Sequence, residues 1–188
     1  KTQPETLPAF FGVPFTVKDL LDTQGVQTTY GSRSLEHNIP NSDVVAVARI
    51  RAAGAILIGK TTTPEFASKV TTDCALTGIT RNPWAPSLSS GGSSGGDGVA
   101  IATGIVPFGV STDGGGSSRI PASACGVLGM KVTIGAIPHE TWPFHFGNNS
   151  AIAINSRHVE DLVLGFNLMA GASSMDPWSR RRIEPLTQ

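Results

Sequence analysis

The chain has 188 residues, which is about the length of one ordinary domain. Hydrophobic residues make up 39% of it and charged residues 15%, so the chain can bury a core, and this composition argues against intrinsic disorder. Lys and Arg number 14 and so do Asp and Glu, and the resulting net charge of zero gives no field that would attract nucleic acid or an anionic membrane.

Apolar periodicity predicts an alternation of short strands and helices. In chain order we expect a strand over 12–17, a helix over 44–53, a buried strand over 55–58, a small-residue helix over 96–103, a strand over 106–112 and an amphipathic helix over 159–169. Ser42 or Asp43 is the expected cap of the helix over 44–53, and Ser156 that of the last helix. Helices interleaved with apolar strands predict an α/β layered fold.

Glycine is concentrated in one segment, residues 85–126, which holds 11 of the 22 glycines and only three charged residues. A flexible linker is also rich in Gly and Ser, but it would not contain the apolar runs at 99–102 and 105–108. We therefore expect a packed segment in which the backbone turns tightly or approaches another group closely.

Two common motifs are matched without their structural context. Residues 54–61 fit the phosphate-binding formula G-x-x-x-x-G-K-[ST], but a helix precedes them and the middle residues are themselves a predicted strand. Residues 91–96 fit G-x-S-x-G around Ser93 or Ser94, but no strand precedes them, and none of the later histidines stands in a catalytic setting. Neither nucleotide binding nor a Ser-His-Asp triad is favoured.

Three segments, one of them the Gly/Ser run at 91–96, carry the residues of an activated serine. Ser117 follows three glycines, whose N–H groups can point into one concavity of the kind that binds an oxyanion. A serine needs a base, and no histidine lies in any of these segments. Lys18, at the end of a predicted strand, is the candidate base if burial keeps it neutral. The third segment is the Gly/Ser run around Ser93.

On these residues, from Gly12 to about Trp178, the sequence resembles the amidase signature family of serine hydrolases. The resemblance implies a Ser–cis-Ser–Lys triad, with Ser117 as the nucleophile, Ser93 as the bridging serine on a cis peptide bond, and Lys18 as the base. It also implies the family fold, a mixed and mostly parallel central sheet flanked by helices.

The resemblance also implies the residues around the triad. The oxyanion hole would be formed by the N–H groups of Gly114, Gly115, Gly116 and Ser117, and the supporting hydrogen bonds by Ser94, Asp113 and Arg119. Ser118 stands where the family usually has a bulky aliphatic residue, which predicts looser packing directly behind the nucleophile.

The activity implied is hydrolysis of a carboxylic amide to an acid and ammonia or an amine, with no metal or organic cofactor. Two alternatives stay open: the glutaminase subunit of a tRNA-dependent amidotransferase, and a truncated, inactive relative that serves in binding or assembly. Family enzymes are much longer, so we expect residues 1–188 to be a single core domain and a fragment of a longer enzyme. A homodimer, or the missing remainder of the chain, would then complete it.

Partners and location follow from the same observations. We expect a small-molecule amide substrate and no nucleic acid, and no apolar run approaches the roughly 20 residues of a membrane helix. Cys74 and Cys125 are too few for a disulfide scaffold, and unpaired cysteines without a signal peptide favour the cytoplasm. One aromatic group either lines an apolar pocket or packs in the core: Phe10, Phe11, Trp142, Phe144 and Phe146.

Overall fold

The computed structural model describes residues 7–140, 149–179 and 183–187. Two 3-10 turns, at Arg33–Leu35 and Glu65–Ala67, and a small hairpin accompany the main strands and helices. The elements in chain order are β1 (Pro14–Lys18), α1 (Val45–Ala52), β2 (Ile56–Thr61), β3 (Asp73–Cys74), β4 (Gly78–Ile79), α2 (Gly95–Ala102), β5 (Phe108–Asp113), α3 (Arg119–Cys125), β6 (Leu128–Lys131), β7 (Ala151–Ser156) and α4 (Val159–Met169).

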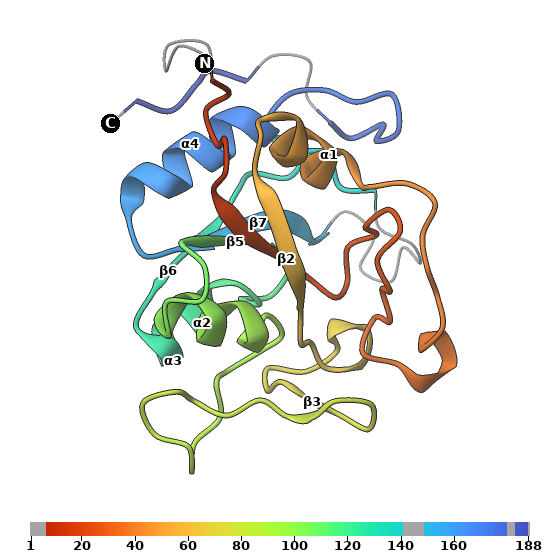
Figure 1. The fold of residues 1–188 in the computed structure, drawn as a ribbon, viewed down its shortest axis with the longest axis vertical. Coiled ribbons are helices and arrows are strands. Elements are labelled where there is room, and N and C mark those ends of the chain that lie inside the picture. Colours follow the sequence, from red (N-terminus) through yellow and green to blue (C-terminus); the bar gives the residue numbers. More distant parts are fainter. Residues whose placement is uncertain (1–6, 141–148, 180–182, 188) are drawn as a thin grey trace.

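In the described part of the chain, the central sheet has five strands in the order β2-β1-β5-β7-β6. β1 is parallel to β2 and β5, whereas β7 is antiparallel to β5 and β6, so four of the five strands run in one direction. Helices α1 and α4 cover one face of the sheet, and α2 and α3 lie on the other (Figure 1). The expected α/β fold with a mixed, mostly parallel sheet is confirmed.

The core lies between the sheet and the α1–α4 layer. The rings of Phe10 and Phe15 stack against Phe108, with centroids 4.6 and 5.6 Å apart. Every residue of β5 and β7 is buried, as expected for central strands covered on both faces. The strand that bears Asp113 is thus held rigidly at the centre of the molecule.

The strand predicted over 55–58 forms as β2 but is not buried. It is an edge strand of the described sheet, and the side chains of Ile56 and Ile58 are 54% and 50% exposed. The uninterrupted apolar run indicated a central strand. Such a run does not show whether another strand pairs with the outer edge of this one.

Both predicted helix caps are wrong. The N–H of Val45, in the first turn of α1, donates to Glu140 Oε2 at 2.9 Å, and neither Ser42 nor Asp43 caps the helix. Ser156 is the last residue of β7, and its hydroxyl donates to the carbonyl of His158 at 2.7 Å. A contact from distant Glu140 takes the place of the first cap, and the second predicted cap lies in β7, a strand that the sequence analysis did not predict.

Of the aromatic group for which the sequence left two interpretations open, the structure describes only Phe10 and Phe11. Phe10 is a core residue, Phe11 is 60% exposed, and Trp142, Phe144 and Phe146 lie outside the described residues.

Both cysteines are free thiols, and burial raises the pKa of Cys125 to about 11. Among the described helices, none has the length and apolar character needed to cross a bilayer.

Candidate active site

Lys18 is the last residue of β1 and is fully buried. Its Nζ lies 2.7 Å from Ser93 Oγ and 2.9 Å from Thr112 Oγ1, both within hydrogen-bond distance. The end of a strand fixes the lysine backbone, and two hydroxyls from other segments fix its amine. The predicted base and the predicted bridging serine are therefore in direct contact.

The electrostatic environment of Lys18 favours a neutral amine. Burial lowers the pKa of Lys18 to about 7, against the opposing influence of the carboxylates of Asp97 and Asp113. A group with this pKa is about half deprotonated at neutral pH, whereas an ordinary lysine is almost entirely charged. Lys18 can thus accept a proton at physiological pH.

The loop that carries Ser93 is anchored by close backbone packing. The Gly92–Ser93 peptide bond is cis, as expected. Thr72 Oγ1 donates to the Gly91 carbonyl at 2.9 Å and accepts from the N–H of Gly95 at 3.0 Å. A Cβ on Gly92 would lie 2.7 Å from the backbone nitrogen of Thr71, so glycine is required for this approach.

Ser117 lies beside the same loop, immediately before α3. The N–H of Ser94 donates to the carbonyl of Ser117 at 3.0 Å, and Ser94 Oγ donates to the carbonyl of Thr112 at 3.4 Å. Ser117 is half-buried, whereas Ser93 and Ser94 are fully buried. The structure thus brings together the three segments that the sequence singled out.

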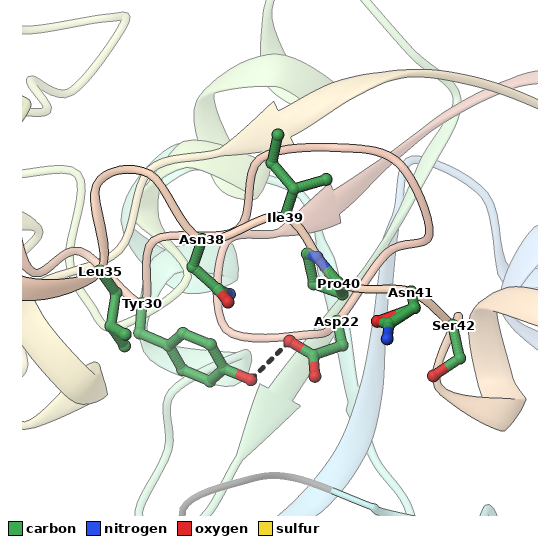
Figure 2. Close-up of a pocket in the computed structure, with 8 residues that line it drawn as sticks. All are labelled: Asp22, Tyr30, Leu35, Asn38, Ile39, Pro40, Asn41 and Ser42. Carbon is green, nitrogen blue, oxygen red and sulfur yellow. Dashed lines mark hydrogen bonds between the residues drawn. The ribbon is translucent and has the colours of Figure 1, made fainter.

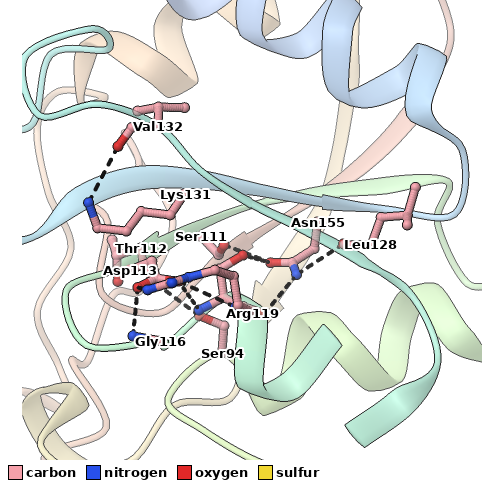
Figure 3. A network of polar contacts seen from close by, with 11 residues as sticks. Ser94, Ser111, Thr112, Asp113, Gly116, Arg119, Leu128, Lys131, Val132 and Asn155 are labelled. Carbon is pink, nitrogen blue, oxygen red and sulfur yellow. Dashed lines mark hydrogen bonds and ion pairs between the residues drawn. The ribbon is translucent and has the colours of Figure 1, made fainter. Parts of the chain in front are cut away.

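The loop before Ser117 is organised around the carboxylate of Asp113. Asp113 accepts hydrogen bonds from the N–H groups of Gly116, Ser118 and Arg119 and from the Arg119 guanidinium, at 2.7 to 3.3 Å (Figure 3). Burial alone would raise the pKa of Asp113, but these hydrogen bonds outweigh it and lower that pKa. Asp113 is therefore a fixed anion that shapes the turn.

This arrangement bears on the predicted oxyanion hole. The N–H of Gly116 already donates to Asp113 Oδ1 at 2.7 Å, so Gly116 is not a free donor in this structure. The N–H groups of Gly114, Gly115 and Ser117 donate to no acceptor within the described residues, and Gly115 is exposed.

Ser118 does not leave the loose packing that an aliphatic-to-serine change predicted. Its buried hydroxyl donates to Asn155 Oδ1 at 3.0 Å, and Ser111 donates to the same oxygen at 2.7 Å. Asn155 Nδ2 in turn donates to the carbonyls of Ser118 and Leu128, at 3.1 and 3.3 Å (Figure 3). This network fixes the residue that follows Ser117.

Sequence reasoning missed Thr72, Thr112 and Asn155 as parts of the site. Thr112 was within reach, because it directly precedes Asp113 in the third segment and a buried lysine amine needs more than one partner. Thr72 and Asn155 lie far from the motifs in sequence, and no local pattern marks them.

The described residues contain no group of three or more His, Cys, Asp or Glu side chains that could hold a metal ion.

A separate pocket of about 270 Å³ is lined by residues from Asp22 to Ser42 (Figure 2). There the Tyr30 hydroxyl donates to Asp22 at 2.6 Å, and burial raises the pKa of this phenol. The pocket contains none of the three motif segments.

Comparisons with known proteins agree with this geometry. A sequence model of the family described as amidase matches residues 1–187. The chain is similar to the acylamidase of Rhodococcus erythropolis, with 43% identity over 96% of this chain and 38% of that enzyme. It is also similar to a glutamyl-tRNA(Gln) amidotransferase subunit from Roseiflexus sp. (strain RS-1), with 41% identity over 88% of this chain and 34% of that protein.

The fold has solved counterparts as well. A bacterial aryl acylamidase of the amidase signature enzymes superposes with a TM-score of 0.88 and 34% identity, over 95% of this chain and 38% of that one. The chain therefore spans well under half the length of each relative compared with it.

Proposed function

The chain belongs to the amidase signature family, and we propose that it carries the acyl-transfer site of an amidase that hydrolyses a carboxylic amide through a covalent intermediate on Ser117. The observation that supports this most strongly is the 2.7 Å contact between Lys18 Nζ and Ser93 Oγ, made by a fully buried amine. A buried lysine without a salt bridge has little structural value, but it is suited to act as a base.

In the proposed first step, Ser117 Oγ attacks the carbonyl carbon of the amide. Its proton passes to Ser93 Oγ, while the Ser93 proton passes to neutral Lys18, which becomes an ammonium ion. The carbonyl oxygen gains the negative charge and is stabilised by backbone N–H groups of the loop at 114–117.

In the second step, the tetrahedral intermediate collapses and the C–N bond breaks. The proton held by Lys18 returns through Ser93 to the departing amine, which leaves as ammonia or a neutral amine. Water then attacks the acyl-enzyme with the same base, and the products are the free acid and regenerated Ser117.

The loop assignments follow from this scheme. Asp113 and Arg119 hold the turn that presents the N–H donors, and Ser94 ties that turn to the Ser93 loop. We assign Gly114, Gly115 and Ser117 as the first oxyanion donors, with Gly116 joining only by sharing its hydrogen with Asp113.

The test is hydrolysis of a set of small amides, from primary amides to anilides, followed by release of both acid and amine. We expect turnover of at least one of them by the wild-type chain and none by Ser117→Ala. Equal turnover by both proteins would overturn the proposal.

A glutaminase-type role within a larger complex is the second candidate, and the 41% identity to an amidotransferase subunit favours it. On that alternative, free glutamine would be the amide substrate, and ammonia release would rise when a partner protein is added. A folded chain that turns over neither glutamine nor other amides would instead fit an inactive binding module.

Domain organisation and location are proposals of the same kind. One main core cluster that draws on β1, β5, β7, α1 and α4 supports a single domain over residues 1–188. Two free thiols support a cytoplasmic location, and the chemistry needs a small-molecule amide rather than nucleic acid.

A further inference from the structure

The proposed mechanism makes no use of one fully buried carboxylate, that of Asp97 in the first turn of α2. Its Oδ1 accepts a hydrogen bond from Thr16 Oγ1 at 3.0 Å. Its Oδ2 and the neighbouring Thr61 Oγ1 meet hydrogen-bond geometry with no described residue, although the Thr61 hydroxyl favours the charged form of Asp97. Burying a carboxylate with so little direct compensation is costly, so its presence calls for an explanation.

The space for this carboxylate exists because β5 has a glycine, Gly109, beside it. Gly109 is paired with Thr16 across the sheet, and a Cβ on Gly109 would lie 2.5 Å from Asp97 Oδ1 and 2.8 Å from Thr16 Oγ1. A side chain at position 109 would therefore push the carboxylate out of its place. The position of Asp97 is built into the sheet.

Asp97 lies on the same side of β1 as the candidate base. Residues two apart on a strand face the same side, so Thr16, which binds Asp97, and Lys18 point in one direction. Asp97 is the strongest of the charges that raise the pKa of Lys18, and Asp113 on β5 is the other. Burial raises the pKa of Asp97 to about 6, and that rise is opposed first by the hydroxyls of Thr61 and Thr16 and then by the charges of Lys18 and Lys60.

Lys60, from β2, is the other cation near Asp97, and its amine is hydrogen-bonded to other residues. Its Nζ donates to the carbonyl of Leu21 and to the hydroxyls of Thr23 and Thr28, at 2.8 Å and 3.1 Å for the hydroxyls. Lys18 Nζ likewise has only neutral hydroxyl oxygens as hydrogen-bond partners among the described residues. Asp97 forms an ion pair with neither amine in that part of the chain, so its charge acts on both through space.

We propose that Asp97 is a positioning residue that acts through Lys18: its buried carboxylate, held by Thr16 on the same side of β1, stabilises the ammonium ion that Lys18 becomes when it takes a proton from the serines. Desolvation by itself would make Lys18 neutral but a weak base, and a base works best when its basicity matches the working pH. The functional consequence rests on the amidase proposal, whereas the electrostatic relationship does not.

The test is a direct titration of Lys18 by NMR in protein labelled with ¹³C-lysine, with the Lys18 resonance assigned by its absence in Lys18→Met. We expect Asp97→Asn to lower the midpoint of this titration by about 1 pH unit. Asp73→Asn, a change at an exposed carboxylate paired with Lys69, is the matched control and leaves the midpoint unchanged.

Thr16→Val provides a second variant that keeps the carboxylate, in case Asp97→Asn does not fold. Without its hydrogen bond Asp97 ionises less readily, so the Lys18 midpoint moves in the same direction by a smaller amount. A midpoint unchanged in both variants would overturn the inference.

The pH profile of serine labelling by a fluorophosphonate separates this inference from the amidase proposal. If Lys18 titrates as expected but no serine is labelled, the amidase proposal fails and the electrostatic relationship stands. If Ser117 is labelled and the acid limb of its profile is the same in Asp97→Asn, the inference fails alone.

Discussion

The amine of Lys18 and the hydroxyl of Ser93, 75 positions apart in the chain, lie 2.7 Å from each other in the interior of the protein. Neither side chain is exposed to solvent, and no carboxylate is within ion-pair distance of the amine among the described residues. A buried lysine paired with a serine in this way is costly as a structural element and useful as a proton acceptor.

The first prediction is a pH dependence of Ser117 reactivity. Because burial lowers the pKa of Lys18 to about 7, the neutral base is present above that pH and is lost as the pH falls through it. The rate of fluorophosphonate labelling should rise through a midpoint near pH 7 and level off above it. A midpoint near 10, the ordinary value for lysine, would show that Lys18 is not the group that titrates.

The second prediction concerns removal of the base itself. Lys18→Ala should slow labelling of Ser117 by about 10²- to 10⁴-fold, the range typical of general acid–base catalysis. Lys69→Ala changes a lysine whose side chain is 47% exposed and is the matched control, with no change in rate expected. Equal rates for Lys18→Ala and the wild type, with circular dichroism showing a folded variant, would contradict the assignment.

The third prediction concerns the network behind the nucleophile. Asn155→Leu leaves the buried hydroxyls of Ser111 and Ser118 without their shared acceptor. It should lower the free energy of unfolding by about 2–4 kcal/mol, since each unsatisfied buried group costs about 1–3 kcal/mol. Urea unfolding measures this, and Asn41→Leu, at an exposed position whose side chain forms no hydrogen bond with the described residues, should change it by less than about 0.5 kcal/mol. Similar losses of unfolding free energy in the two variants would show that the Asn155 network does not stabilise the fold more than an exposed residue does.

The fourth prediction concerns the helix cap supplied from a distance. Glu140 Oε2 accepts from the N–H of Val45, and Glu140 Oε1 accepts from the hydroxyl of Ser173. Glu140→Ala should lower the free energy of unfolding by about 1 kcal/mol, the typical cost of a lost cap. Glu140→Gln keeps an acceptor and should lose less, whereas Ser42→Ala should have no effect on α1. A larger loss of unfolding free energy in Ser42→Ala than in Glu140→Ala would show that Ser42, and not Glu140, caps α1.

The fifth prediction tests the space reserved beside Asp97. Gly109→Ala places a methyl group 2.5 Å from Asp97 Oδ1, and we expect a loss of about 1–3 kcal/mol in the free energy of unfolding. Gly59→Ala, on β2, meets nothing within 4 Å and is the matched control, with little or no loss. Thermal or urea unfolding of the two variants makes the comparison, and equal stability would mean that β5 shifts to accept the methyl group.

The sequence predicted those features of the fold that depend on local patterns. The strands that become β1 and β5 and the helices that become α1, α2 and α4 all form close to their predicted ranges. Features that depend on contacts between residues far apart in the chain could not be predicted from the sequence. β7 and β6 were missed, because their short runs are stabilised by pairing in the sheet rather than by an evident periodicity.

The site shows the same division. Residue types alone indicated Ser117 and Lys18, whereas the role of Ser93 was predicted from the family resemblance; the structure brings the three segments together. Asp97 and Asn155 do not have such a signature, since an isolated Asp in a helix or Asn in a strand indicates a solvated surface more often than a buried contact. Their importance depends on burial, which the sequence alone does not report.

The central claim is that Ser117 is a nucleophile activated through Ser93 by Lys18. The most direct test is reaction of the folded chain with a fluorophosphonate, followed by intact mass measurement and peptide mapping. We expect a single adduct on Ser117, which is absent in Ser117→Ala and forms more slowly in Lys18→Ala. An adduct on Ser94 that forms at the same rate without Lys18, or no adduct on a chain that circular dichroism shows to be folded, would contradict it.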